Sequence, residues 1–303
     1  MNSTPGYRTP AAFRRALTEK LRATARPQGP WALPDLQRQF AYDRLLVRLY
    51  QLDDAWILKG ATALLARRIA VRHTIDVEFY REASRKQAER DLRTAIARDA
   101  GDWFQFEAGE SRPVADGANG VRVPIVARIG ATAWAQFHVD VVAEGVCMTG
   151  RPDHVPALTN VALPGLAHSG YWAYPLVDHI ADKTCAILER PGGTGRPSTR
   201  FKDLVDLVAL VANAKPSAAA QRRALDSEAG RRGISLPGRF EVPDVPLWRA
   251  GYAAEAGRAL DHVTGTLEEA LAEVSPFLDP LLDGSARGTW VPGRRVWAGP
   301  PSA

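Results

Sequence analysis

Apolar residues recur at two different spacings in the first half of this chain. Over residues 36–50 they repeat every three to four positions, which is the period of one helix face. Short apolar runs follow, and several of them alternate with polar residues as a half-buried strand does. A charged amphipathic stretch over 81–100 between them predicts another helix. The predicted strands cover residues 75–79, 104–106, 121–129 and 133–142.

The pattern changes near residue 175. Helical spacing returns over 176–188 and 201–213, and residues 217–303 indicate a further helical region with a Pro-, Gly- and Arg-rich tail. The predicted order is helix, strand, helix, antiparallel-type strands and then further helices. This order predicts an α+β fold. We therefore divide the chain into a basic N-terminal segment (1–33), a core (34–170) and a helical C-terminal domain (171–303).

One predicted strand carries two acids at alternate positions. Asp76 and Glu78 share a strand face, whereas Ile75, Val77 and Phe79 are expected on the other face, in the core. Neighbouring like charges repel each other unless a cation lies between them. Mg²⁺ takes one or two carboxylates together with substrate phosphates. Asp76 and Glu78 are therefore candidate Mg²⁺ ligands, although such a strand with one wet face is also common without a metal.

A small-residue turn precedes this strand. Lys59, Gly60, Ala61 and Thr62 open a short helical run. Glycine lets the backbone approach a bound group, and the first amides of a helix have no intrahelical partner and favour anions. Lys59 adds a positive charge and Thr62 a hydroxyl, so we expect the turn to hold the β- and γ-phosphates of a nucleotide. The alternative for Lys59 is a solvated turn residue.

Three further polar residues accompany the two acids. Asp140 lies in the later apolar run over residues 137–142. If that run pairs beside the strand of Asp76 and Glu78, three carboxylates converge. The alternative for Asp140 is a surface position on an edge strand. Arg72 and Thr74 precede Asp76 and could contact phosphate, although Arg72 could instead balance the acids.

Composition narrows the class of protein. With 303 residues and 46% hydrophobic content the chain can bury a sizeable core. Two cysteines exclude a disulfide framework and indicate a reducing compartment. The sequence shows no apolar run of membrane-spanning length and no signal-peptide pattern. We therefore expect a cytoplasmic protein without a membrane partner.

The charge is mildly basic, with a formal net charge of +5 and a pI near 9.4. Basic residues gather in short clusters, which favours a polyanionic partner such as nucleic acid, although arginine-rich surfaces also occur without one. The clusters are Arg14-Arg15, Arg67-Arg68, Arg196 to Lys202, Arg222-Arg223, Arg231-Arg232 and Arg294-Arg295.

Several of these segments together resemble the AbiEii-like nucleotidyltransferase toxins, a family that includes the mycobacterial MenT group. K-G-x-T-A-L begins at Lys59, R-x-T-x-D-x-[DE] begins at Arg72, and a distant acid follows on another strand. Two later segments extend the resemblance, a helix that contains Lys183 and a K-D-x-x-D-L motif that begins at Lys202. Together the motifs span about residues 55–212. The chain departs from the family pattern at Glu78, where Asp is usual.

The resemblance implies a fold and an activity. The fold is a nucleotidyltransferase-type mixed sheet with flanking helices over 34–170, followed by a mainly helical region in which Lys183 and Asp203 face the cleft. The activity is Mg²⁺-dependent transfer of a nucleoside monophosphate from an NTP to an RNA acceptor, the tRNA 3′ end, with release of pyrophosphate. Translation would stop as a result. A toxin of this kind also implies a cognate antitoxin protein.

Asp206 is expected to cap its helix or to pair locally with Lys202 or Arg200, and His73, His138 and His179 lack ligand spacing and are expected to be structural. The resemblance assigns roles to the other candidate residues. The catalytic residues are Asp76, Glu78, Asp140, Lys183 and Asp203, of which Asp76 and Glu78 bind the metal, and the nucleotide-binding residues are Lys59, Gly60, Ala61, Thr62, Arg72 and Thr74.

Two other functions remain open on the sequence. One is an enzyme of the same superfamily that attaches a nucleotide to a protein hydroxyl. The other is a catalytically silent RNA-binding module, because Glu78 carries its carboxylate one methylene further from the backbone than Asp does.

Overall fold

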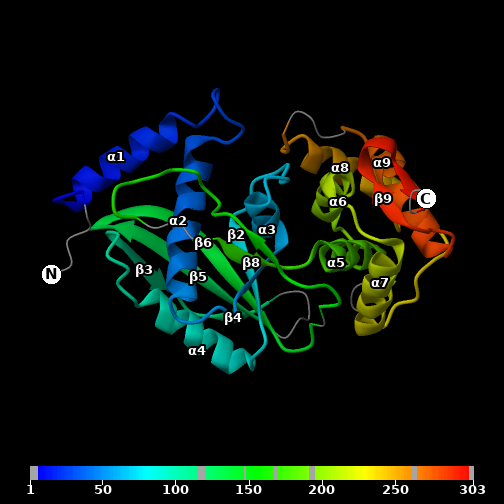
Figure 1. Cartoon of the computed structure of the whole chain (residues 1–303), viewed down its shortest axis with the longest axis horizontal. Coiled ribbons are helices and arrows are strands. Elements are labelled where there is room, and N and C mark those ends of the chain that lie inside the picture. The colour runs from blue at the N-terminus through cyan, green and yellow to red at the C-terminus, as the bar shows by residue number, and fades with distance from the viewer. Residues whose placement is uncertain are drawn as a thin grey trace. The chain divides into compact units, whose positions relative to one another are not determined.

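The computed structural model describes residues 6–114, 120–146, 148–166, 170–190, 195–260 and 265–299. Its contacts divide the chain into two compact units. Unit 1 contains Met1–Arg68, His73–Val146 and Asp153–Ala173. Unit 2 contains Ile69–Arg72, Cys147–Pro152 and Tyr174–Ala303. Strands β1 to β8 belong to unit 1 and helices α5 to α9 to unit 2 (Figure 1).

Unit 1 is built on a mixed sheet, so the predicted α+β fold is confirmed. The strands follow the order β3-β5-β6-β2-β1-β8-β7, with β4 paired to β5. The pairs β2/β6 and β1/β8 are parallel, and the other pairs are antiparallel. The strands are β1 (Ile57–Lys59), β2 (Asp76–Arg81), β3 (Phe104–Ala108), β4 (Arg112–Pro113), β5 (Gly120–Ile129), β6 (Thr132–Ala143), β7 (Asp153–Val155) and β8 (Tyr171–Ala173).

Helices cover one face of this sheet with apolar side chains. The Tyr42 ring of α2 packs edge-on against Phe137 of β6, with the ring centroids 4.8 Å apart. Val77 and Phe79 of β2 are fully buried. Because successive strand residues alternate between faces, Asp76, Glu78 and Asp140 lie on the face opposite α2. The helices of unit 1 are α1 (Pro10–Arg22), α2 (Leu33–Tyr50), α3 (Gly60–Ala66) and α4 (Arg85–Ile96).

The segment around β2 differs from the sequence prediction at both ends. Ile75 lies before the strand and is 54% exposed, so its predicted place in the core is wrong. The strand continues to Arg81, and the helix that follows begins only at Arg85. Ser84 sets this start, because its side chain accepts a hydrogen bond from the Gln87 amide at 3.3 Å, as an N-cap residue does.

Unit 2 is mainly helical, as predicted. The helices predicted over 176–188 and 201–213 have those bounds in the structure. The apolar face of the second is buried against α5, α8 and α9. In the described part of the chain, no helix is both long enough and apolar enough to cross a membrane. The helices are α5 (Leu176–Leu188), α6 (Phe201–Asn213), α7 (Ala218–Arg232), α8 (Val245–Ala256) and α9 (Leu267–Leu282).

The C-terminal tail is more ordered than its composition indicates. A hairpin of β9 (Thr289–Val291) and β10 (Val296–Ala298), joined by the 3₁₀ turn η2 (Pro292–Arg294), follows α9. The rings of Trp290 and Trp297 both contact Phe277 of α9, at centroid distances of 5.0 and 4.9 Å. Long-range aromatic packing therefore orders a segment whose local composition favours irregular structure.

Candidate functional site

The two strand acids lie on one partly exposed face of the sheet, beside the third acid. β2 and β6 pair in parallel with Glu78 opposite Asp140 and Asp76 opposite His138. The pairing on which the convergence of the three acids depended therefore forms, and three carboxylates meet on the face that α2 leaves open. The Asp76 side chain is 28% exposed and that of Asp140 is 9% exposed. Asp76 thus remains accessible to a ligand from solvent.

Charged residues extend this arrangement into a row across four strands. Lys59 of β1 lies opposite Glu78, and Arg122 of β5 lies opposite Asp140. Directly opposed residues share a sheet face, so the row reads Lys59, Glu78, Asp140, Arg122. Two negative charges in the middle therefore lie between a positive charge at each end. With Asp76 added, the cluster contains three acids and two bases and has an excess of negative charge.

Arg122 is the residue of this cluster that the sequence reasoning missed. Its Nε and Nη2 atoms donate to the two carboxylate oxygens of Asp140, both at 2.7 Å, and Nη2 lies 3.4 Å from Asp76. The hydrogen bonds to Asp140, and the charges of Asp140, Asp76 and Glu78, raise the pKa of Arg122 above its ordinary value. The one available signal was its polar position between the buried Val121 and Val123 of β5.

The backbone of Asp76 is held by two threonines. The Thr62 hydroxyl donates to the Asp76 carbonyl at 2.9 Å. The Thr74 hydroxyl donates to the same carbonyl at 3.1 Å and accepts from the Asp76 amide at 3.2 Å. Tyr42 in turn donates to the Thr74 carbonyl at 3.1 Å. In this structure both threonine hydroxyls therefore position the acid, whereas the sequence reasoning assigned them to phosphate.

Gly60 is required by its closeness to Glu78. Its φ of +59° lies in the left-handed region, which favours glycine. A Cβ at this position would lie 2.1 Å from Oε1 of Glu78. The sequence reasoning expected Gly60 to admit a bound group, and in the structure the group it admits is the second strand acid. Lys59, Ala61 and Thr62 are buried beside it.

His138 lies closer to the acids than its isolated position in the sequence indicated. Its Nδ1 atom is 3.2 Å from Oδ1 of Asp76. Asp76 thus has an imidazole on one oxygen and Arg122 near the other. His138 shares the strand face of Asp140, two residues along β6, which places it in the cluster.

The donor set limits how a metal could bind. Within the described ranges, no group of three or more His, Cys, Asp and Glu side chains is arranged to hold a metal ion. Both oxygens of Asp140 are engaged by Arg122. Asp76 and Glu78 are carboxylates on one open face, which fits Mg²⁺ because this ion uses one or two carboxylates and completes its shell with water and phosphate.

Unit 2 contains a second charged cluster, and this one is buried. Lys183 of α5 donates to Asp203 at 2.8 Å and to Asp206 at 2.7 Å. Arg72 donates to both oxygens of Asp206, at 2.9 and 2.7 Å. Arg200 lies 3.9 Å from the remaining oxygen of Asp203. The cluster therefore joins the segment before β2 to α5 and α6 through ion pairs.

The two cations outweigh the cost of burying Asp206. Burial alone would raise the pKa of Asp206, but the charges of Lys183 and Arg72 hold it at about 2. For Lys183, burial alone would lower the pKa, whereas the charges of Asp203 and Asp206 raise it above its ordinary value. Lys183 and Asp206 are consequently both ionised near neutral pH.

Two sequence expectations change here. Asp206 was expected to pair with Lys202 or Arg200, and in the structure its buried carboxylate accepts hydrogen bonds from Lys183 and Arg72. Arg72 was expected either to contact phosphate or to balance the strand acids, and its guanidinium binds Asp206. Asp203 keeps contact with Lys183, as its motif position indicated.

A mixed sheet that presents paired acids beside a glycine turn is the arrangement of a nucleotidyltransferase-type protein. A family model described as the nucleotidyl transferase AbiEii toxin of type IV toxin–antitoxin systems matches residues 44–274. The match covers most of the chain and extends into both units. The chain therefore belongs to the AbiEii nucleotidyl transferase toxin family.

A solved structure agrees on the fold. The chain is similar to MenT4, the nucleotidyltransferase toxin Rv2826c from Mycobacterium tuberculosis H37Rv, with 17% identity, a TM-score of 0.53 and coverage of 88% of this chain and 89% of that chain. It is also similar to JHP933 from Helicobacter pylori, with 14% identity, a TM-score of 0.45 and coverage of 81% and 92%. At 17% identity, the likeness to MenT4 supports the fold alone. A comparison with curated proteins gave no match.

Proposed function

We propose that the chain transfers a nucleoside monophosphate from an NTP to a hydroxyl of RNA, the 3′ end of tRNA in the first place, and releases pyrophosphate. One observation supports this most directly. The pairing of β2 with β6 brings Asp76, Glu78 and Asp140 to one open face beside the Gly60 turn, in a chain of the nucleotidyl transferase toxin family. Modified tRNA would stop translation, and a cognate antitoxin would restrain the activity.

Mg²⁺ would be held by Asp76 and Glu78 and would neutralise the triphosphate and the charge that develops at the α-phosphorus. The chain supplies the geometry. Thr62 and Thr74 hold the Asp76 backbone in place before substrate arrives, so that little reorganisation is needed. Lys59 and the turn at Gly60 would receive the β- and γ-phosphates.

The reaction forms a bond between the acceptor oxygen and the α-phosphorus and breaks the bond to the β-phosphate, which leaves with pyrophosphate. The acceptor hydroxyl must lose its proton in this step. Asp140 is our candidate to attract that proton or to complete a second metal position. In either role Arg122 has to release at least one Asp140 oxygen, because it occupies both.

Lys183 and Asp203 keep the catalytic roles that the family resemblance implies. Lys183 has three N–H donors, and two of them bind Asp203 and Asp206. Among the described residues the third donor has no acceptor, and we propose that it binds a phosphate oxygen. Arg72 is proposed to act through Asp206, as a positioning residue of this cluster.

The test is a labelling assay with the full-length chain. Protein is incubated with total tRNA, Mg²⁺ and each of the four α-³²P-labelled NTPs. We expect one nucleotide or a subset of the four to label tRNA. The Asp76→Asn variant should lose this labelling, because it lacks the negative charge that would hold Mg²⁺. The substitution keeps the side-chain volume, so the fold should be unaffected. Asp54→Asn is the matched control, since Asp54 is an exposed acid in the same unit. Label in protein and not in RNA would show that the acceptor is a protein hydroxyl. No label in any lane would reject the proposed transferase activity.

A further inference from the structure

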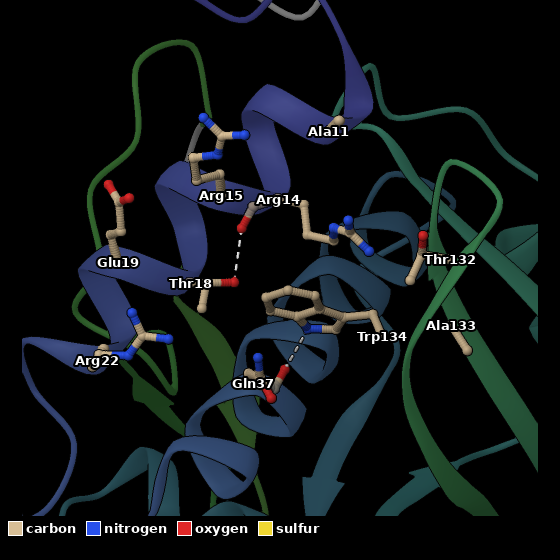
Figure 2. A pocket seen from close by; sticks show the side chains of 10 residues that line it. All are labelled: Ala11, Arg14, Arg15, Thr18, Glu19, Arg22, Gln37, Thr132, Ala133 and Trp134. Atoms are coloured by element: carbon tan, nitrogen blue, oxygen red, sulfur yellow. Dashed lines mark hydrogen bonds between the residues drawn. The ribbon is translucent and has the colours of Figure 1, made fainter.

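A groove in unit 1, away from the acids, lies between α1 and the start of β6 (Figure 2). It encloses about 510 Å³. Arg14, Arg15 and Arg22 of α1 form one wall, Trp134 forms the other, and Gln37 of α2 lies at the base. In Figure 2 the Arg14 side chain extends toward the indole of Trp134. We call this feature the N-terminal groove.

Both walls are anchored by packing. Phe13, Leu17 and Leu21 of α1 are fully buried, and their spacing of four residues fixes which face of the helix turns outward. On the opposite wall, the Trp134 indole N–H donates to the Gln37 carbonyl at 2.8 Å, and its ring packs edge-on against Phe104 with centroids 6.1 Å apart. The groove is therefore preorganised.

The turn before β6 also contacts the start of α1. Gly130 has a φ of +59°, and a Cβ there would lie 2.9 Å from Cβ of Pro10, the first residue of the helix. No residue with a side chain fits this contact without displacing the helix. The β5–β6 turn and α1 are thus held against each other at the end of the groove that Arg14 and Arg15 occupy.

The groove carries uncompensated positive charge. It contains three arginines against one acid, Glu19. Among the residues that the structure describes, none forms an ion pair with the side chains of Arg14, Arg15 or Arg22. Other arginines of unit 1, such as Arg44, Arg48 and Arg81, bind carboxylates. A groove with spare guanidinium groups attracts an anion.

The spacing of the arginines favours a polymer of phosphates over a single phosphate. Arg15 and Arg22 are seven residues apart, which corresponds to about 10 Å along the helix axis. A nucleic-acid strand in a duplex carries a phosphate about every 3.4 Å of axis, so the two arginines meet different phosphates. A single inorganic phosphate cannot contact both positions and the tryptophan.

Trp134 adds the second half of the recognition chemistry. Its polar N–H is satisfied by Gln37, and the side chain stays partly exposed. A flat apolar ring beside guanidinium groups is a stacking surface for a nucleobase. Nucleic acid offers bases together with a chain of phosphates, whereas an acidic protein segment would use the arginines without the ring.

We propose that the N-terminal groove binds a single-stranded segment of RNA, with its phosphates on Arg14, Arg15 and Arg22 and a base on Trp134. The choice of RNA over DNA rests on the function proposed above. The groove then binds the acceptor RNA, whereas the carboxylates perform the transfer.

Anisotropy of a labelled single-stranded RNA of about 12 nucleotides, a length in the range of known single-strand sites, tests the groove with the full-length chain. The groove variant is Arg14→Ala/Arg15→Ala/Arg22→Ala. The matched control is Arg85→Ala/Lys86→Ala/Arg90→Ala, which removes the same charge from exposed positions of α4. We expect at least a 10-fold weaker affinity in the groove variant and less than a 3-fold change in the control.

Two further readouts sharpen the result. Because the groove variant can no longer neutralise three phosphates, its slope of log affinity against log salt should flatten by about 2. Trp134→Leu should weaken binding about 5-fold or more at every salt concentration without changing that slope. Equal affinities of the two triple variants would overturn the proposal, and so would a loss confined to binding of a purified acidic partner protein.

The groove and the transferase reaction can fail separately. Asp76→Asn should bind the RNA as wild type does, which keeps the binding assay independent of catalysis. If wild type transfers no nucleotide but the groove variant loses RNA affinity, the groove stands and the proposed activity falls. If transfer occurs and the groove variant keeps its KM for tRNA, the groove is rejected and the activity stands.

Discussion

The two units each contain a cluster of charged residues, and the clusters differ in exposure and in balance. In unit 1 the Asp76 side chain is 28% exposed, and the cluster has one more acid than base. In unit 2 Asp206 is 1% exposed, and two acids face two cations at hydrogen-bonding distance. Solvent lets the first cluster keep spare negative charge, whereas burial forces the second to pair every charge.

This difference indicates how each cluster can act. An open cluster with excess negative charge can gain a cation from solution, so substitutions there should affect activity more than folding. A buried and balanced cluster contributes to the folded structure itself, so substitutions there should affect folding even where a residue is also catalytic.

The largest expected effect is on the stability of unit 2. Lys183→Met keeps most of the side-chain volume and removes the charge, which leaves Asp203 and Asp206 short of a partner. Loss of one member of a buried ion pair costs about 3–5 kcal/mol. We expect a decrease of that size in the unfolding free energy from urea titration. Lys202→Met is the control, because Lys202 is exposed on the same motif and should change stability little. An unchanged unfolding midpoint for Lys183→Met would show that the buried cluster is dispensable for folding.

At Gly60 we expect a smaller effect in free-energy terms, and we expect it on the rate of transfer. In Gly60→Ala the new methyl group displaces the flexible end of Glu78, so the carboxylate moves while the fold adapts. Misplacement of a catalytic group by about 1 Å costs roughly 100-fold in rate. The transfer rate should fall by about that factor. Gly101→Ala is a matched control, since Gly101 has a φ of +67° but a Cβ there meets nothing within 4 Å. Equal rates for the two variants would disprove the role of the contact with Glu78.

Acid should weaken unit 2 through Asp206. Its folded pKa of about 2 lies below its usual value of 3.8. The ionised carboxylate therefore contributes its full stabilisation above pH about 4, and this is lost as the pH falls to about 2. The loss amounts to about 2 kcal/mol. Unfolding free energies measured at several pH values should decrease more steeply over this window for wild type than for Asp206→Asn. Parallel curves for the two proteins would contradict the assignment.

The smallest effect is expected at the pair of the partly exposed Arg122 and the buried Asp140. Arg122→Gln frees both Asp140 oxygens and increases the excess negative charge. Because the Arg122 side chain is 39% exposed, solvent screens its charge, and we expect its effect on a bound cation to be about 0.2–1 kcal/mol. The Mg²⁺ concentration for half-maximal transfer should therefore fall roughly 2- to 5-fold. Arg128→Gln serves as the control, because Arg128 lies on the same strand and pairs with the exposed Glu107. A higher Mg²⁺ requirement in Arg122→Gln would instead indicate that Arg122 binds substrate.

Much of the fold followed from local patterns. The helices over 176–188 and 201–213 were predicted with the bounds they have, because their apolar period is a property of residues close in sequence. The strand of Asp76 and Glu78 was found for the same reason. The predictions failed where contacts between distant segments determine the structure. Ile75 was expected in the core but is exposed, and the hairpin that contains Trp290 is ordered by packing against α9.

The candidate site shows the same division. The pair Asp76 and Glu78, the glycine turn and the family motifs could be identified without the structure, because neighbours along the chain set face and turn geometry. Only the tertiary structure placed Arg122 on Asp140 and turned Asp206 inward to Lys183. Those contacts depend on strand register and helix packing between segments far apart in the chain. A lone arginine or aspartate carries no local sign of the partner that will balance its charge.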